Sequence, residues 1–565
     1  MIKKRINLLR KKFRTNKIDG YIVPKNDEFF GEYSCHDRLK IISNFDGSAG
    51  FAIILKKKNY LFVDGRYTIQ AKKQSGKNFK IVEIHKLLPY KIINNLKLGF
   101  DPNLFTERQL KIYFKNTSTL VPLSKNLIDQ INKKRDAQNK PFFSINKKIA
   151  GESHASKINK VLKKIISYKA DYIFISAPEN VAWLLNIRGH DNPNSPIPHC
   201  RLLISKKKEI FLFADRYKFS KISKETKFKK FKIVDLNNLE KVIKKIKAKK
   251  FIIDPLTCSI KNQSIIQSKF KIIPKNDPCY LLKSLKNPIE VKNMIKAHVE
   301  DGVALTKFIY WIKKTNKKKI TEIDAEKKLE KFRKINKNYL FPSFNTIAGT
   351  GSNGAIVHYR ATKDSNKIIK KKDIFLCDSG GQYRFGTTDV TRTLCFAKQP
   401  NSIKDIFTKV LKGHIAVATT NINRYSKGKQ IDIKARKYLQ KDGLDYAHGT
   451  GHGVGFFLNV HEGPQSISKY NSVKLEEGMI ISNEPGYYKK GYYGIRIENL
   501  VFIKRNRKKL NFENLTLAPI EKDLINFDLL NKKEKNYLFD YHLNVYAKIS
   551  KFLDQKERKW LASLI

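Results

Sequence analysis

The feature that most constrains the fold is a set of five possible metal ligands, each expected on or just after a β-strand. They lie in IFLCDSGGQY around Asp378, TTDVTRT around Asp389, HGTGHGVG around His452, ISNEPGYY around Glu484 and GIRIENLV around Glu498. Four carboxylates and one imidazole can hold two divalent ions when one or two carboxylates bridge them. The chain is therefore expected to bring these strings together into a site that activates water.

Local patterns indicate how the first two acids could meet. Ile374 to Leu376 is an apolar run typical of a β-strand, and it delivers Asp378 at its end. Gly380-Gly381 and Gly386 are expected to mark a turn, and residues 387–393 should form the returning strand. Two neighbouring strands would then present Asp378 and Asp389 to one point.

The later acids follow similar patterns. Apolar and charged residues alternate from Ile495 to Glu498, so Arg496 and Glu498 share one face of a strand. Arg496 is then able to orient a neighbouring carboxylate. Residues 479–481 are typical of a buried strand that leads to Glu484 and ends at Pro485-Gly486.

Each signal has a structural alternative when it is taken alone. An aspartate after a strand is usually a turn or cap residue, and the pair His448 and His452 could belong to a structural turn among glycines. Five such strings in this order are hard to explain in that way.

These strings resemble the metal-dependent aminopeptidases of the pita-bread fold, and most closely the long three-domain Xaa-Pro aminopeptidases, or aminopeptidase P. The resemblance implies that Asp378, Asp389, His452, Glu484 and Glu498 bind two divalent ions, with manganese expected and cobalt, zinc or iron also suited to the ligand set. No ligand is substituted. The implied reaction releases the N-terminal residue from peptides with proline in the second position, through a water that bridges the two ions.

Further site residues come from the same resemblance. It assigns substrate binding and transition-state stabilisation to His358 in GAIVHYRA, His448 in HGTGHG and His461 in LNVHEGP, and it makes Glu484 the expected general base. His358 and His461 would hydrogen-bond the scissile carbonyl, His448 would line the proline side, and the substrate α-amine would meet Asp378 or a metal. The strings NFDGSAG and DGRY resemble the first domain of the family, so Arg66 is a candidate for reaching the substrate. The structural alternatives are a capped turn for His358, ordinary core packing for His448 and His461, and a solvated ion pair with Asp64 for Arg66.

We expect an α/β (α+β) chain with four parts. Two creatinase-like α/β modules should occupy residues 1–145 and 146–286, a pita-bread catalytic domain residues 287–508, and a C-terminal extension residues 509–565. The two modules suggest a duplicated architecture, and the loop NKKRDAQNKPFF should close the first. The extension, with a helical pattern that includes Tyr541 and Trp560, resembles one associated with homodimers.

The catalytic domain should open with a helix. Asn287 can be its N-cap, Pro288 suits the first helical position and Glu290 can complete a capping box. Val291, Ile295, Val299 and Val303 recur every four residues with Met294 beside them, which predicts that this stripe is core.

Net charge and cysteine use limit the partners. The formal net charge of +63 would normally indicate nucleic acid, but the lysine-dominated excess is spread over every domain, so we expect no specific nucleic-acid partner. Six cysteines, Cys35 among them, form no CxxC pair and no secreted-type framework, which fits the cytoplasm. The sequence contains no run of 18 or more apolar residues, so we expect no membrane span.

Two alternatives stay open. Prolidase, the Xaa-Pro dipeptidase, shares the ligand types, and a catalytically inactive pita-bread binding module shares the fold. An inactive module usually loses metal ligands, whereas this chain keeps all five. Peptides of three or more residues distinguish an aminopeptidase from a dipeptidase.

Overall fold

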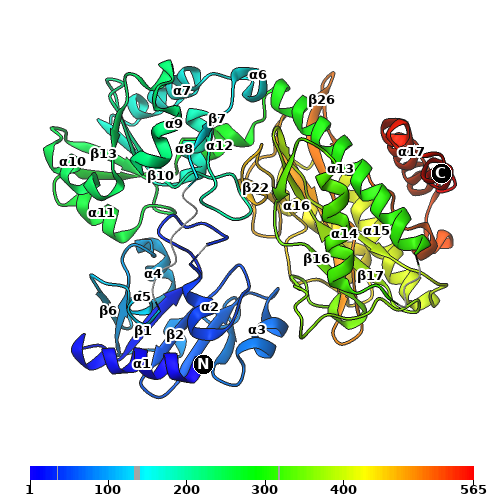
Figure 1. The fold of residues 1–565 in the computed structure, drawn as a ribbon, viewed down its shortest axis with the longest axis horizontal. Helices are drawn as coiled ribbons and strands as arrows, with labels where there is room; N and C mark the ends of the chain where they lie inside the picture. Colours follow the sequence, from blue (N-terminus) through cyan, green and yellow to red (C-terminus); the bar gives the residue numbers. More distant parts are fainter. Residues whose placement is uncertain (35, 133–139, 316–318) are drawn as a thin grey trace. The chain divides into compact units, whose positions relative to one another are not determined.

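The computed structural model describes residues 1–34, 36–132, 140–315 and 319–565. The chain forms two compact units, of which the first comprises Met1–Lys147 with Glu152–Tyr280, and the second Lys148–Gly151 with Leu281–Ile565 (Figure 1). The architecture is a mixture of helices and sheets, as the sequence predicts. Cys35 and most of the predicted linker loop lie outside the described residues.

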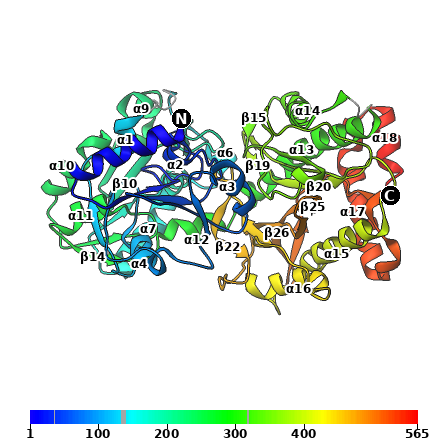
Figure 2. The ribbon, with the colours of Figure 1, turned by 90° about the horizontal axis from the view of Figure 1, so that it is seen from below.

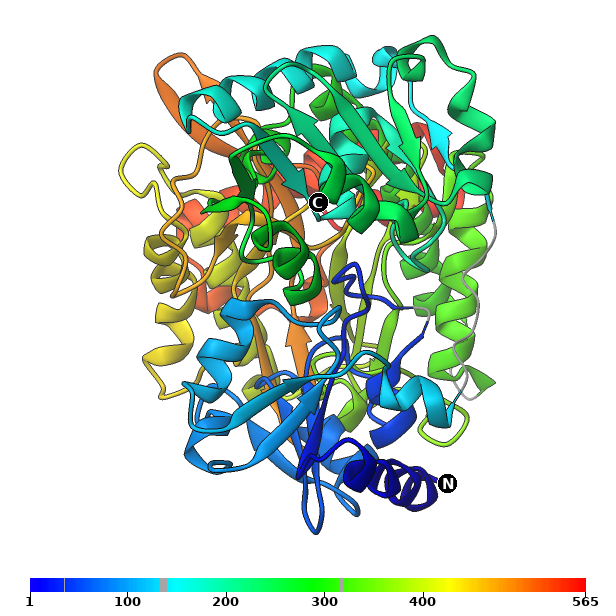
Figure 3. The same ribbon diagram turned by 90° about the vertical axis from the view of Figure 1, so that its left-hand side faces the viewer.

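The first unit contains two six-stranded sheets, which can be followed by colour in Figure 3. The first sheet has the order β4-β3-β2-β1-β5-β6 and consists of β1 Gly20–Pro24, β2 Phe51–Leu55, β3 Asn59–Val63, β4 Lys80–Glu83, β5 Lys97–Phe100 and β6 Thr119–Pro122. The second has the order β12-β11-β10-β8-β13-β14 and consists of β8 Tyr172–Ile175, β10 Cys200–Ser205, β11 Ile210–Ala214, β12 Lys232–Val234, β13 Lys250–Ile253 and β14 Lys271–Pro274.

The two sheets share one topology. In each, the central strand pairs antiparallel with one neighbour and parallel with the other, and both edge strands are parallel to their neighbours. This correspondence confirms the duplicated architecture that the sequence suggested. A short pair, β7 Phe143–Ser144 and β9 Ile187–Arg188, completes the strands of this unit.

Helices cover these sheets through apolar stripes. In α1, Ile6, Leu9 and Phe13 are buried, and in α7 the buried side chains include Ile158 and Ile165. The α-helices of residues 1–284 are α1 Ile2–Thr15, α2 Arg38–Ser43, α3 Thr68–Ser75, α4 Glu107–Phe114, α5 Leu127–Ile131, α6 Lys147–Ala150, α7 His154–Ser167, α8 Pro178–Leu185, α9 Arg216–Ser223, α10 Leu239–Lys245, α11 Ile260–Gln267 and α12 Pro278–Ser284; most of α6 and the end of α12 belong to the second unit.

The second unit is built around several smaller sheets. A five-stranded sheet has the order β22-β21-β23-β26-β27, two three-stranded sheets have the orders β16-β17-β20 and β15-β18-β19, and β24 pairs with β25. Their strands are β15 Tyr339–Pro342, β16 Ile347–Thr350, β17 Phe375–Ser379, β18 Gly381–Tyr383, β19 Gly386–Thr387, β20 Val390–Leu394, β21 Gly451–Gly453, β22 Glu462–Ile467, β23 Ile480–Asn483, β24 Gly486–Lys489, β25 Tyr493–Arg496, β26 Asn499–Asn506 and β27 Lys509–Asn514. The helices are α13 Pro288–Lys314, α14 Glu322–Lys334, α15 Asn401–Ala418, α16 Gly428–Gln440, α17 Lys532–Ile549 and α18 Gln555–Ala562.

Helix α13 begins as predicted but buries a different face. Asn287 and Glu290 form the capping box, with Pro288 in the first turn. The predicted stripe lies at the edge of the core: the three valines are half-buried and pack against apolar clusters, whereas Ile295 is 39% exposed. The buried face includes Met294 and Asp301 instead, and buried polar groups on it find partners that periodicity alone does not reveal.

The C-terminal helices pack onto the second unit (Figure 2). Leu538, Tyr541 and Val545 of α17 lie in one apolar cluster with Phe407 and Leu411 of α15. The helical pattern expected for this segment is confirmed. Within the described ranges, no helix combines the length and apolar character needed to cross a membrane. The five described cysteines are buried and form no disulfide with one another.

Candidate metal centre

Two paired strands deliver the first two acids. Strand β17 pairs antiparallel with β20, and Asp378 lies opposite Thr391. Asp389 directly precedes β20. The connecting turn lies at residues 384–385, beyond the predicted Gly380-Gly381, because β18 and β19 extend the hairpin. Gly380 is needed for close packing instead, since an added Cβ would lie 2.0 Å from the Thr388 carbonyl oxygen.

The five-stranded sheet delivers the remaining ligands. His452 lies in β21, which pairs with β23, and Glu484 directly follows β23. Glu498 directly precedes β26, the next strand of the same sheet. A backbone hydrogen bond of 3.2 Å from the Glu498 N–H to the Thr391 carbonyl joins this sheet to the strand that follows Asp389.

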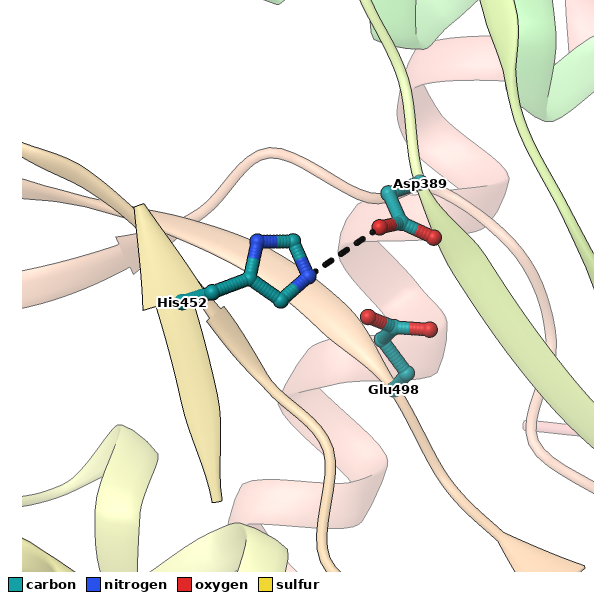
Figure 4. Close-up of side chains that lie close together, drawn as sticks. All are labelled: Asp389, His452 and Glu498. Atoms are coloured by element: carbon teal, nitrogen blue, oxygen red, sulfur yellow. Dashed lines mark ion pairs between the residues drawn. The ribbon is translucent and has the colours of Figure 1, made fainter. Parts of the chain in front are cut away.

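Four of the five predicted ligands therefore converge, as Figure 4 shows for three of them. Asp389, His452 and Glu498 each offer a ligand atom, and these atoms all lie within 4.8 Å of one another. His452 Nε2 lies 3.4 Å from Asp389 Oδ2 and 3.6 Å from Glu484 Oε1. Because His452 Nδ1 lies 3.0 Å from the Gly453 carbonyl oxygen, Nε2 is the nitrogen that faces the acids.

Asp378, the fifth predicted ligand, is held by Arg496. The Arg496 guanidinium donates from Nη2 to Asp378 Oδ2 over 2.6 Å, which confirms the expected orienting role of this arginine. The other carboxylate oxygen, Asp378 Oδ1, is buried and has no hydrogen-bond partner. A buried oxygen without a partner is costly unless a bound group satisfies it.

Crowding of these acids changes their ionisation. Burial raises the pKa of Asp389 to about 6, and the charges of Asp378 and Glu484 add to this rise. Burial, followed by the charges of Asp389 and Glu484, raises the pKa of Glu498 well above its ordinary value. For His452, burial lowers the pKa, but the hydrogen bond to Asp389 and the charge of Glu484 outweigh it and raise the pKa to about 9.

The donor set fits two divalent cations. Four carboxylates share the site with one imidazole, and the Arg496 guanidinium supplies the compensating charge at Asp378. Negative charge is therefore in excess, one buried oxygen lacks a partner, and carboxylate oxygen with imidazole nitrogen is a usual ligand combination for divalent metals.

Three supporting residues were not predicted. Thr391 Oγ1 donates to Glu498 Oε2 over 2.7 Å, and Ser482 Oγ donates to Glu484 Oε1 over 3.1 Å. Each is two residues from a predicted ligand, so the alternation of strand side chains could have identified both. The Tyr488 hydroxyl accepts a hydrogen bond from Arg496 Nη1 and lies 2.9 Å from His448 Nε2. No local sequence pattern indicates this link.

The three predicted histidines lie in the second unit. His448 Nδ1 is 4.0 Å from Glu484 Oε2, and the rings of His461 and His452 are 4.3 Å apart in an edge-on arrangement. His358 lies in the loop after the short helix η5 Gly351–Asn353, and its neighbour Tyr359 packs with Leu376 of β17. The substrate-binding roles of the three histidines stay predictions.

Arg66 lies in the first unit. Its Nη2 is 2.7 Å from Asp64 Oδ2, and its side chain is 29% exposed, so the ion pair considered from the sequence is present. Its reach to a substrate stays a prediction.

Comparison with known proteins places these features in a family. Residues 292–505 match metallopeptidase family M24, residues 508–564 match the C-terminal region of peptidase M24, and residues 5–131 and 132–290 each match a creatinase/prolidase N-terminal domain.

Several known proteins are similar to this chain over nearly its whole length and their own. A Coprinopsis cinerea protein named "Probable Xaa-Pro aminopeptidase P" is 36% identical over 99% of this chain and 97% of its own length. Xaa-Pro aminopeptidase 1 of Dictyostelium discoideum is 34% identical over 100% of this chain and 96% of its own length. The crystal structure of a Caenorhabditis elegans X-prolyl aminopeptidase, described as a cytosolic enzyme with a di-nuclear active site, matches with a TM-score of 0.92 and 29% identity, covering 100% of this chain and 99% of its own.

Proposed function

Since this chain belongs to metallopeptidase family M24, we propose that it is a metal-dependent aminopeptidase that releases the N-terminal residue from peptides with proline in the second position. The observation that carries the proposal is the negatively charged cluster formed by Asp389, His452, Glu484 and Glu498, with Asp378 and its unpartnered oxygen. Full-length similarity to Xaa-Pro aminopeptidases supports the substrate class.

The five acidic and imidazole side chains would hold two divalent cations, and manganese is the proposed metal. When bound, the cations supply Lewis acidity, which lowers the pKa of a water and polarises a carbonyl. Metal analysis of the purified protein, followed by reloading of the chelated protein with manganese, cobalt, zinc or iron, tests the choice. Higher activity with another metal at equal occupancy would exclude manganese as the preferred ion.

The side chains around the cluster divide the work of peptide hydrolysis. Glu484 acts as general base: a carboxylate oxygen accepts the proton of the attacking water and passes it to the leaving nitrogen. Ser482, which donates to Oε1 of Glu484, holds this carboxylate in place.

The histidines receive the substrate. His461 and His358 donate hydrogen bonds to the scissile carbonyl as negative charge builds on its oxygen, worth about 2–4 kcal/mol per donor by analogy with oxyanion holes. His448 lines the side occupied by proline. The substrate's free α-amine would meet Asp378 or a bound metal, which would limit cleavage to one N-terminal residue.

Proline in the second position gives the pocket two features to select. The scissile bond is a tertiary amide without an N–H, and the ring is a rigid apolar shape. Arg66 is proposed to contact the substrate from the first unit. An Arg66→Ala variant should raise KM more than it lowers kcat, because a binding contact remote from the reacting bond acts largely before the transition state.

The deciding experiment is hydrolysis of an Xaa-Pro-Xaa tripeptide and of the matching Xaa-Pro dipeptide, with added manganese, by the parent protein and by Glu484→Gln. We expect release of the first residue from the tripeptide by the parent and a loss of about 10³-fold in kcat in the variant, within the range for general-base catalysis. Cleavage confined to the dipeptide would make the protein a prolidase. A folded, metal-loaded parent that cuts neither peptide would be a binding module.

A homodimer is proposed through the C-terminal helices. Phe539 and Leu543 lie one turn apart on α17 and are 50% and 45% exposed, and Phe552 beyond the helix is 49% exposed. Exposed apolar side chains at helical spacing are typical of interfaces. Light scattering should give twice the chain mass for the parent and the monomer mass for Phe539→Ser/Leu543→Ser; a monomeric parent would remove the proposal.

A cytoplasmic location is proposed as well. The five described cysteines form no disulfide with one another, which fits a reducing compartment, and the similar C. elegans enzyme is described as cytosolic. Fractionation of the source cells, followed by detection with an antibody, tests this location. Recovery in a membrane or secreted fraction would contradict it.

A further inference from the structure

A cluster of three buried charges lies next to His461. Lys283 Nζ is 3.0 Å from Glu462 Oε2, and Lys286 Nζ is 2.5 Å from Glu462 Oε1. None of the three side chains is more than 2% exposed. These residues, Lys283, Lys286 and Glu462, are called the lysine clamp below.

We propose that the lysine clamp is a positioning device that fixes His461 for the transition state, so that Glu462 controls kcat without touching substrate or metal. This inference rests on the role given to His461 in the proposed function. Glu462 follows His461 directly in the chain, and both of its carboxylate oxygens are hydrogen-bonded. A carboxylate held from two directions cannot rotate, so the backbone next to His461 is restrained.

Strand pairing brings the same restraint to the metal cluster. Glu462 is the first residue of β22 and lies opposite Gly453 of β21, the residue after His452. On the other side of the peptide, the His461 ring packs edge-on against the His452 ring at 4.3 Å. His461 is therefore fixed between the lysine clamp and the ligand His452.

The loop from β21 to His461 has little room to adjust. Its apolar side chains are at most 2% exposed: Val454, Phe456, Phe457, Leu458 and Val460. Gln382 Nε2 donates to the Leu458 carbonyl over 2.8 Å. An added Cβ at Gly455 would lie 3.1 Å from Glu462 Oε2, so the Glu462 carboxylate itself forms part of this packing.

Lys286 extends the restraint to the strand that leads to Glu484. Its backbone N–H donates to the Gly478 carbonyl over 3.1 Å, and Gly478 precedes β23. Gly478 has a φ of +86°, and an added Cβ would lie 2.5 Å from the Lys286 carbonyl oxygen. One segment therefore braces both the His461 loop and the β23 strand.

Ionic contacts suit this task better than apolar packing. Hydrogen bonds to a charged group are directional, whereas apolar side chains of similar volume can fill the same space in several ways. Buried charges are retained at a cost in desolvation, which is offset only when each is paired in good geometry. The lysine clamp meets that requirement at both Glu462 oxygens.

The test is a double-mutant cycle between Glu462→Gln and His461→Ala, measured on an Xaa-Pro-Xaa tripeptide with metal-loaded enzyme. We expect Glu462→Gln to lower kcat by about 10- to 100-fold, as expected for a misplaced catalytic group, with KM changed less than about threefold and metal content unchanged. In the His461→Ala background, the same substitution should lower kcat by less than about threefold, because there is no imidazole left to position.

Each other outcome overturns a distinct statement. If His461→Ala alone leaves kcat unchanged, the proposed role of His461 is wrong. If His461→Ala lowers kcat but Glu462→Gln does not, or if the two losses multiply, the positioning role of the lysine clamp is wrong. If Glu462→Gln lost bound metal although all five proposed metal ligands are kept, the positioning role would also be rejected.

A matched control separates positioning from general loss of an ion pair. The Glu534 side chain is 8% exposed, compared with 1% for Glu462, and Glu534 Oε2 accepts from Lys412 Nζ over 2.6 Å at the start of α17. Glu534→Gln should leave kcat within about twofold of the parent. If Glu462→Gln does not fold, Lys283→Met removes one of the two contacts and should show a smaller loss with the same dependence on His461; equal losses in both backgrounds would reject the proposal.

Discussion

Two buried groups of charge in the second unit contain similar side chains but are balanced in opposite ways. In the lysine clamp, two lysines face one carboxylate. Burial raises the pKa of Glu462, but the charges of Lys283 and Lys286 outweigh burial and hold it below its ordinary value. The group is satisfied by the chain alone.

The metal-binding cluster has the opposite balance. Its acids outnumber the cations that the chain supplies, burial and mutual repulsion raise the pKa of Asp389 and Glu498, and one oxygen of Asp378 has no partner. The comparison teaches that burial of charge does not itself mark a functional site. A bound ion is expected where buried charge of one sign is in excess and a buried polar atom has no partner.

Metal removal should give the largest contrast between the two groups. We expect chelation to abolish tripeptide hydrolysis and to lower the free energy of unfolding by about 3 kcal/mol relative to protein with metal at 100 times its Kd. Thermal unfolding and activity, before and after manganese is restored, measure both effects. An unchanged Tm after complete removal of metal would mean that the acid cluster does not depend on cations for stability.

Breaking the balanced group should cost stability with metal present or absent. Glu462→Gln leaves two buried lysines without their carboxylate, and loss of one partner of a buried ion pair typically costs about 3–5 kcal/mol. Urea unfolding of the metal-free parent and variant, followed by a signal that reports on the second unit, gives the difference in the free energy of unfolding. Glu534→Gln, at the less buried pair with Lys412, should cost less.

Removing one charge from the unbalanced group should have the opposite sign. Glu498→Gln in metal-free protein should raise the free energy of unfolding by on the order of 1–2 kcal/mol, since one unit of raised pKa corresponds to about 1.4 kcal/mol. The same variant should lose activity. If it unfolds more easily than the metal-free parent, the acids are not in electrostatic excess and the comparison fails.

Acid pH should remove part of the stabilisation by Glu462. Its folded-state pKa lies below the ordinary value, so the contribution is complete above about pH 4.5 and is lost as the pH falls through the lowered pKa. The difference in stability between the parent and Glu462→Gln should therefore shrink below about pH 4.5. The total decrease should be about 1.4 kcal/mol for each unit by which the folded-state pKa of Glu462 is lowered. A difference that stays constant from pH 7 to pH 3.5 would contradict this linkage.

Local patterns predicted much of the fold. The start of α13, with Asn287, Pro288 and Glu290, and strands such as β2 and β8 follow directly from capping and apolar runs. The local sequence pattern did not predict which face of α13 is buried. Its Asp301 is buried because Arg333 of α14 reaches it over 2.7 Å, and the partner of a buried charge lies far away in sequence.

The site was predictable to a similar extent. The candidate ligands were readable because they lie in or next to short strands, and Thr391 and Ser482 could have been found from alternation along those strands. Tyr488 could not, because its hydroxyl joins Arg496 and His448 only through the packing of separate strands.

The amino-acid sequence by itself determined which side chains could bind metal, which strands and helix caps would form, and that two similar modules precede the catalytic part. Only the tertiary structure decided which charged groups are balanced, because that depends on contacts between residues far apart in the chain. Glu462 and Glu498 look alike in the sequence. One is held by two lysines that precede it by more than a hundred residues, and the other faces three carboxylates from separate strands.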